Sequence, residues 1–223
     1  MAGKYIIFDS GPLINFAMNN MLGILIKIKE SFSVEFLITK EVKQEIIDYP
    51  ITLKKYEYEA LQLQDIFNKG IIKHANLTDE QINELRKIRE EIMNLANSTF
   101  YTNKNNIPLL EKGECAALAL SVIIKEPNII AVDERTTRML CESPENLKKL
   151  LENKFHTKIM ARKENYEFFK RFKIIRSTEL AYISYKKGFF EIKDTRTLDA
   201  ALWALKLHGC SISEIEIEQM KKM

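Results

Sequence analysis

The chain has 223 residues, of which 46% are hydrophobic and 29% charged, with only 7 glycines and 5 prolines. This composition excludes a disordered or fibrous protein and provides enough apolar side chains for one large core. The three cysteines are too few and too widely spaced for a disulfide framework or a zinc knuckle, and we expect Cys115 to be a small core residue.

The net charge of +3 hides an asymmetry along the chain. Residues 1–147 carry 17 Lys and Arg against 21 Asp and Glu, whereas residues 148–223 carry 17 against 10. Clustered positive charge suits a polyanion such as nucleic acid, although a solvated lysine-rich surface explains the same composition. No apolar run is long enough to span a bilayer, and the N-terminus lacks a signal-peptide pattern. We therefore expect a cytoplasmic protein with no membrane partner.

Apolar runs alternate with helical spacings along the first hundred residues. The runs KYIIF (4–8), VEFLI (34–38) and, more weakly, GIIKH (70–74) predict buried strands. Helices are predicted in TKEVKQEIID, with Thr39 as N-cap, over 53–68, and over 78–97, where a Thr and a Gln form a capping box. The segment YTNKNNIP, residues 101–108, predicts a loop.

The second half of the chain continues the alternation. LLEKGECAALALSVIIKEP contains a helix that is apolar on nearly all sides, which is typical of a buried helix. NIIAV (128–132) predicts a strand, followed by helices in ERTTRML and NYEFFKRF, then a strand and a helix in KIIRSTELAYISYKKGFF. A further helix over 194–207 ends at Gly209. The alternation predicts an α/β fold whose parallel sheet is covered by helices on both faces.

Four acids occupy positions that suggest a binding site. Asp9 and Asp133 each end an apolar strand, and the crevice beyond the carboxyl ends of parallel strands is where α/β proteins bind ligands. Glu114 lies in the first turn of the most hydrophobic helix; Glu45 lies in the helix after the second strand, four residues beyond Glu41. If brought together, these acids repel one another and raise their own pKa values unless a cation neutralises them. An all-oxygen cluster favours Mg²⁺ or Mn²⁺.

Each acid taken alone also has a structural interpretation. Asp9 could form an Asx-turn and Asp133 could cap a helix. Glu114 could simply suit the helix dipole, and Glu45 could be a solvated helix residue. The neighbouring Glu134 could be an extra acid of the site, but we expect it to face solvent.

The segments IIFDSGPLINFA, LITKEVKQEII, EKGECAALALS and IIAVDERTTRML resemble, in order and character, the acidic motifs of PIN-domain nucleases. The match is closest to stand-alone prokaryotic PIN proteins, although Gly11 stands where their first motif has Ser. Residues 177–213 resemble the C-terminal part of those proteins. The resemblance implies one domain over residues 1–223, with a basic helical insertion at about 139–172. The implied fold is a three-layer, PIN-like α/β fold with a central parallel sheet of four or five strands.

The resemblance also implies a metal-dependent nuclease that hydrolyses phosphodiester bonds, most often an endoribonuclease, and a toxin of a toxin–antitoxin pair is a natural role for it. Asp9, Glu114 and Asp133 would be ligands of Mg²⁺ or Mn²⁺, and Glu45 would complete the four catalytic acids. The expected partners are RNA, an antitoxin protein and a second copy of the chain.

Substrate contacts are expected from four further residues. Ser10 would hydrogen-bond a ligand, and Asn15 would orient Asp9 unless it caps a helix. Arg135 and Arg138 would contact phosphate unless they are ordinary surface charges. No Ser or Cys has a His partner in a motif, so the sequence predicts no nucleophilic side chain.

Two other functions are compatible with strand-end acids. A catalytically silent PIN-like module would bind RNA or a protein partner, but the presence of all four acids argues against silence. A phosphatase-like or receiver-like protein would also use such acids with Mg²⁺, yet it requires a downstream strand-end Lys that the sequence does not offer.

Overall fold

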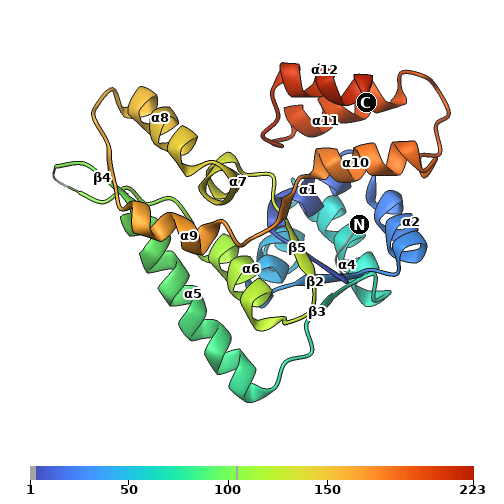
Figure 1. Cartoon of the computed structure of the whole chain (residues 1–223). Helices are drawn as coiled ribbons and strands as arrows, with labels where there is room; N and C mark the ends of the chain where they lie inside the picture. The colour runs from blue at the N-terminus through green and yellow to red at the C-terminus, as the bar shows by residue number, and fades with distance from the viewer. Residues whose placement is uncertain (1–3, 104) are drawn as a thin grey trace.

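The computed structural model describes residues 4–103 and 105–223. Within these ranges, five strands form a parallel sheet in the order β3-β2-β1-β5-β7, and two more form an antiparallel ribbon (Figure 1). The strands are β1 (Tyr5–Phe8), β2 (Glu35–Ile38), β3 (Ile72–His74), β4 (Phe100–Tyr101), β5 (Asn128–Ala131), β6 (Met160–Ala161) and β7 (Ile174–Ile175).

Helices precede and follow nearly every strand. The α-helices are α1 (Ser10–Met18), α2 (Leu22–Phe32), α3 (Lys40–Lys43), α4 (Glu57–Asn68), α5 (Asp79–Thr99), α6 (Lys112–Ile123), α7 (Arg135–Glu142), α8 (Pro144–Phe155), α9 (Tyr166–Phe169), α10 (Ser177–Lys186), α11 (Thr197–Leu207) and α12 (Glu214–Lys222). A π-helix, η1 (Gln44–Asp48), extends α3, and η2 (Pro50–Thr52) and η3 (Lys163–Asn165) are short 3₁₀ helices. In the described part of the chain, no helix combines the length and apolar character needed to cross a bilayer.

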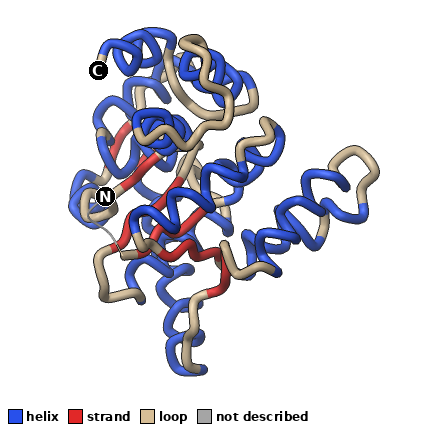
Figure 2. The backbone as a smooth tube through the Cα atoms, turned by 90° about the vertical axis from the view of Figure 1, so that its right-hand side faces the viewer, coloured by secondary structure: helices blue, strands red, loops and turns tan. Residues whose placement is uncertain are grey.

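The sheet separates two hydrophobic cores. Because side chains alternate along a strand, Ile6 and Phe8 of β1 enter one core and Ile7 enters the other. The first core is covered by α1, α2, α4, α10 and α11, and the second by α5 to α9. Figure 2 shows the strands between these helices. The predicted three-layer α/β architecture with a parallel sheet is confirmed, with five strands, and it is consistent with a PIN-like fold.

The strand order creates a crevice beside β1. From β1 the chain passes to β2 and β3 on one side and later returns to β5 and β7 on the other. β1 pairs in register with both neighbours, and the Asp9 amide donates to the Ala131 carbonyl at 3.0 Å. The ends of β1 and β5 are therefore level, at the topological switch point where open α/β sheets bind ligands.

Local signals in the sequence placed several helices correctly. The Thr39 hydroxyl accepts from the Val42 amide at 3.2 Å and caps α3. Thr78 and Gln81 form the predicted capping box of α5. The expected burial of α6 is also confirmed, with Cys115 fully buried.

The structure differs from the sequence prediction in three places. The helix after β2 changes to a π-helix, in which the Tyr49 amide donates to the Gln44 carbonyl at 3.0 Å. The predicted loop over 101–108 begins with Tyr101, which pairs with Met160 of β6; Lys104 lies outside the described residues. The segment NYEFFKRF forms only the short η3 and α9. The pairing of Tyr101 with Met160 joins residues 59 positions apart, which local periodicity does not report.

Candidate active site

A cavity of about 460 Å³ opens beyond the carboxyl ends of β1 and β5. Carboxylates from separate parts of the chain line it: Asp9, Glu45, Glu111, Glu114, Asp133 and Glu134. The remaining lining residues are Ser10, Gly11, Ile14, Asn15, Leu109, Gly113, His208 and Gly209. Among these described lining residues, none is Lys or Arg. The fold thus brings the four predicted acids to one cavity without a basic Lys or Arg partner in its wall.

Asp9 is the N-cap residue of α1 and is only 6% exposed. Burial raises the pKa of its carboxyl from 3.8 to about 7, and the amides of Ser10 and Gly11 offset this only in part. The negative charges of Glu45 and Asp133 raise the pKa further. Near neutral pH, the Asp9 carboxyl is therefore only partly ionised, and a nearby cation would stabilise its charged form.

Asp133 is held by hydrogen bonds from three elements. Its Oδ1 accepts from the Ser177 amide at 2.8 Å, and its Oδ2 accepts from Asn15 Nδ2 at 2.5 Å. Its backbone carbonyl accepts from the Ser211 amide at 2.9 Å. Asn15 therefore orients Asp133, and the prediction that it would orient Asp9 is wrong: strand pairing places Asp133 against α1, which the sequence alone could not indicate.

Glu114 is fixed at the start of α6. Its Oε2 accepts from the Glu111 amide at 2.8 Å, and its Oε1 accepts a short hydrogen bond from the Thr137 hydroxyl. Burial is the largest contribution to its raised pKa of about 7, and the charges of Asp9 and Glu134 add to it, while the two hydrogen bonds act in the opposite direction.

Glu45 reaches the cavity from the first turn of the π-helix η1. Gly113 makes room for it: a Cβ there would lie 2.8 Å from Glu45 Oε1. Burial raises the pKa of Glu45, and a hydrogen bond with the Ser10 hydroxyl lowers it. Glu41 instead bonds to Arg89 at 2.5 Å, outside the cavity lining. The structure thus resolves the choice between the two glutamates in favour of Glu45.

The two predicted phosphate contacts are not part of the cavity wall. Arg135 donates through Nε to Ser211 Oγ at 3.0 Å, and Arg138 lies 3.6 Å from Glu216 and 3.8 Å from Glu142. Both arginines follow Asp133 in sequence and lie in α7, but their side chains contact Ser211 and Glu216, in and after the segment that leads into α12. The structure therefore does not bring them together with the acids.

The sequence reasoning missed two lining residues, Glu111 and His208. The only available signal for Glu111 was its place at the N-cap of α6, three residues before Glu114. His208 Nδ1 lies 2.9 Å from the Ala204 carbonyl, which can only accept, so Nδ1 donates and Nε2 is left for other partners. Glu134 is exposed, as expected, and caps α7 through the Thr137 amide at 2.9 Å.

The donor set of the cavity suits a hard divalent cation. Carboxylate and hydroxyl oxygens are the ligands that Mg²⁺ and Mn²⁺ prefer, and the raised pKa values of Asp9 and Glu114 are those of buried acids without a countercharge. In the described part of the chain, no three Asp, Glu, His or Cys side chains already form a metal-binding group. The fit therefore rests on donor chemistry and on the raised pKa values.

Comparison of the chain with protein-family models, with curated proteins and with solved structures gives no match.

Proposed function

We propose that this protein is a Mg²⁺- or Mn²⁺-dependent nuclease of the PIN type that hydrolyses phosphodiester bonds in RNA within the cytoplasm. One observation carries the proposal: Asp9, Glu45, Glu114 and Asp133, far apart in sequence, line one cavity at the switch point of the sheet. Asp9 and Asp133 are buried, Glu114 is half-buried and Glu45 is exposed. Acids that share a cleft, two of them with pKa values raised to about 7, are typical of a functional site.

Asp9, Glu114 and Asp133 would hold the cation. Once bound, it supplies Lewis acidity and offsets the negative charge that develops on the phosphate during hydrolysis. The protein contributes rigidity: Asn15 and the Ser177 amide fix both carboxylate oxygens of Asp133. Pre-positioned ligands lower the reorganisation required when substrate arrives.

The choice of RNA and of a toxin-like role rests on the motif resemblance and on the positive charge of the C-terminal third. An antitoxin that covers the cavity would then be the natural protein partner. A catalytically silent module that binds RNA or protein is the alternative, and one observation favours it: the hydrogen bonds that hold Glu114 and Asp133 would also suit acids with a purely structural role.

Metal-dependent cleavage by matched variants decides between these functions. Asp9→Asn and Asp133→Asn preserve side-chain size but remove a cation ligand, so each should reduce cleavage of single-stranded RNA in Mn²⁺ by about a thousandfold or more, roughly 4 kcal/mol. Glu41→Gln is the control, because Glu41 bonds to Arg89 away from the cavity, and it should cleave at nearly the wild-type rate.

The silent module would give a different result. Purified wild-type protein, freed of any copurifying partner, would then show the same residual cleavage as both Asp→Asn variants, with or without chelator. Equal RNA binding by all three proteins would identify an RNA-binding module.

A further inference from the structure

The C-terminal segment of the chain reaches the strand-end acid of the cavity. Ser211, between α11 and α12, donates its amide to the Asp133 carbonyl at 2.9 Å, and His208 and Gly209 just before it line the cavity. Figure 1 shows α10, α11 and α12 packed together at the end of the molecule, with α11 between the other two. Asp133 is therefore held partly by residues that follow it by more than seventy positions.

A second contact comes from the start of α10. The amide of Ser177, its first residue, donates to Asp133 Oδ1 at 2.8 Å. Ser177 is fully buried, so water does not compete for this bond. The position of the Asp133 carboxylate thus depends on where α10 begins.

Arg176 joins these two contacts. It directly precedes Ser177, is 7% exposed, and donates through Nη1 to the Ser211 carbonyl at 3.0 Å. The same Nη1 lies 2.8 Å from Glu216 Oε1 in α12, and Nε lies 2.8 Å from Glu179 Oε1 in α10. One guanidinium therefore ties α10, α12 and the peptide that contacts Asp133.

The chemistry of this contact requires arginine. A buried cation is stable only when it is paired and hydrogen-bonded, and the planar guanidinium donates in several fixed directions at once. A lysine ammonium at position 176 has all three of its donors on one nitrogen, whereas Arg176 reaches Glu179 through Nε and Glu216 and the Ser211 carbonyl through Nη1. Removal of the side chain would leave both amide donors to Asp133 without a common support.

We infer that Arg176 is a positioning residue that fixes Asp133 in the cavity through the Ser177 and Ser211 amides, an inference that rests on the proposed metal-dependent function of that cavity. The C-terminal helices would then have a role in the site. Glu216 of α12 holds Arg176 and so helps to position Asp133, which α12 itself does not contact.

The test compares Arg176→Ala with Arg89→Ala in the full chain. Arg89 is a suitable control because its side chain is 12% exposed and pairs with Glu41 and Glu90, which lie outside the cavity lining. Two quantities are measured: amide hydrogen exchange at Ser177 and Ser211 without metal, and the dissociation constant for Mn²⁺ alone. Arg176→Lys is the second variant in case Arg176→Ala does not fold.

Arg176→Ala should accelerate exchange at both amides and weaken Mn²⁺ binding, each by about tenfold, the lower end of the effect that residues supporting metal ligands usually have. Arg176→Lys should show the same changes more weakly, and Arg89→Ala should show neither. Unchanged exchange and Mn²⁺ affinity in both Arg176 variants would overturn the inference. Wild-type protein that binds no Mn²⁺ would instead overturn the proposed function, while the exchange measurement would still decide the role of Arg176.

Discussion

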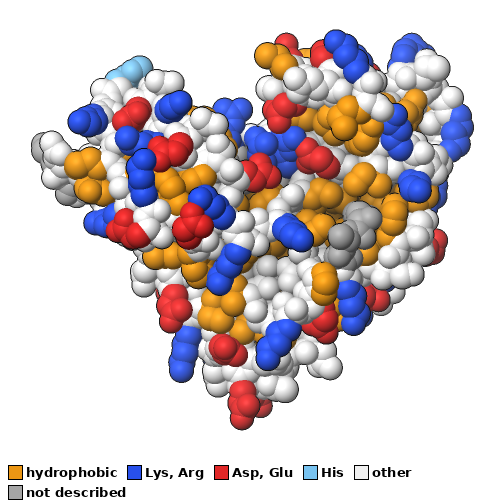
Figure 3. All heavy atoms as spheres, in the orientation of Figure 1, with side chains coloured by type: hydrophobic (Ala, Val, Ile, Leu, Met, Phe, Trp, Pro, Cys, Tyr) orange, Lys and Arg blue, Asp and Glu red, His pale blue; other side chains and the backbone are white. Residues whose placement is uncertain are grey.

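The acidic cavity and the basic insertion at 139–172 differ in whether their charged side chains have partners of opposite charge. In the cavity, Asp9, Glu45, Glu114 and Asp133 gather without a Lys or Arg among the described lining residues, and burial raises the pKa of two of them to about 7. In the insertion, cations are largely matched to partners, and on the face drawn in Figure 3 basic and acidic side chains alternate.

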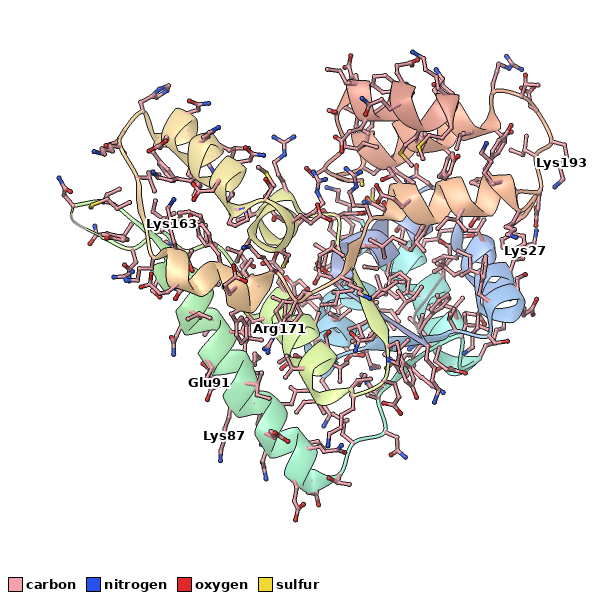
Figure 4. All side chains as sticks on the ribbon, viewed as in Figure 1. Lys27, Lys87, Glu91, Lys163, Arg171 and Lys193 are labelled. Atoms are coloured by element: carbon pink, nitrogen blue, oxygen red, sulfur yellow. The ribbon has the colours of Figure 1, made fainter. Side chains whose placement is uncertain are left out.

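Individual contacts in the insertion show this matching. Arg162 stacks over Tyr101 at 4.5 Å, and Arg171, labelled in Figure 4, lies 3.9 Å from the centre of the Phe168 ring. The ion pairs are Lys163–Glu145 at 2.6 Å, Lys148–Glu152 at 3.7 Å and Lys170–Glu167. Charge that is already paired supports the fold, whereas charge left unneutralised indicates a missing partner. Net charge counted from the sequence does not distinguish paired charges from unneutralised ones.

The largest expected effect is a loss of RNA cleavage that should differ between two acids of the cavity lining, Glu114 and Glu134. Glu114→Gln removes a half-buried carboxylate held by Thr137 and should lower cleavage by about a thousandfold, roughly 4 kcal/mol. Glu134→Gln is the control: Glu134 is exposed and caps α7, and a glutamine oxygen can still accept from the Thr137 amide, so the change should cost less than about 1 kcal/mol of stability and leave cleavage within a few-fold of wild type. Equal losses in cleavage would show that position within the cavity does not matter.

The next effect concerns pH and stability. Asp9 and Glu114 have folded-state pKa values of about 7, above the ordinary 3.8 and 4.5. The folded protein therefore retains protons that the unfolded chain releases between about pH 4 and 7, and metal-free protein should lose a few kcal/mol of stability as pH rises through that interval.

Thermal melting at pH 4.5 to 8, with and without millimolar Mn²⁺, measures this dependence. Mn²⁺ should raise the melting temperature most at and above pH 7, where both carboxylates are charged. Asp9→Asn removes one titrating group, so its metal-free melting curve should depend less on pH. If wild type and Asp9→Asn share the same pH dependence, Asp9 does not titrate as described.

A smaller effect should follow from filling the space beside Glu45. Gly113→Ala places a Cβ 2.8 Å from Glu45 Oε1, a flexible side-chain end that can move aside, so folding should survive. Displacing this carboxylate should reduce cleavage by about tenfold, or 1.4 kcal/mol. Gly23→Ala in α2 is the matched control, since nothing lies within 4 Å of its Cβ; it should stabilise the helix and leave cleavage unchanged.

The smallest effect is expected in the insertion. Lys163→Glu removes an exposed pair with Glu145, worth about 0.2–1 kcal/mol, and should weaken RNA binding by only about two- to threefold. Lys158→Glu, which is exposed in the same segment, should behave similarly. A much larger loss, with a clearly flatter dependence of affinity on salt, would show that the insertion contacts RNA phosphates directly.

The fold class and much of the local structure follow from patterns in the sequence alone. Apolar runs located the central strands, Thr39 and Thr78 marked helix starts, and the all-round apolar pattern of α6 indicated its burial. These features depend on near neighbours along the chain, through side-chain periodicity and capping hydrogen bonds, so a sequence records them directly. Asp9, Asp133 and Glu114 were recognisable because each adjoins an apolar strand or helix, whereas Glu45 was singled out mainly through the motif resemblance.

The way in which these parts meet depends on tertiary packing. The pairing of β1 with both β2 and β5 brings Asp9 and Asp133 to one crevice, and the π-helix η1 carries Glu45 to it. The bonds from Asn15 and Ser177 to Asp133, and the contact of Arg138 with Glu216, join residues 44 or more positions apart. Such contacts form where complementary surfaces pack, and their partners are chosen by strand order and core shape, for which no local pattern in a single sequence provides a signal.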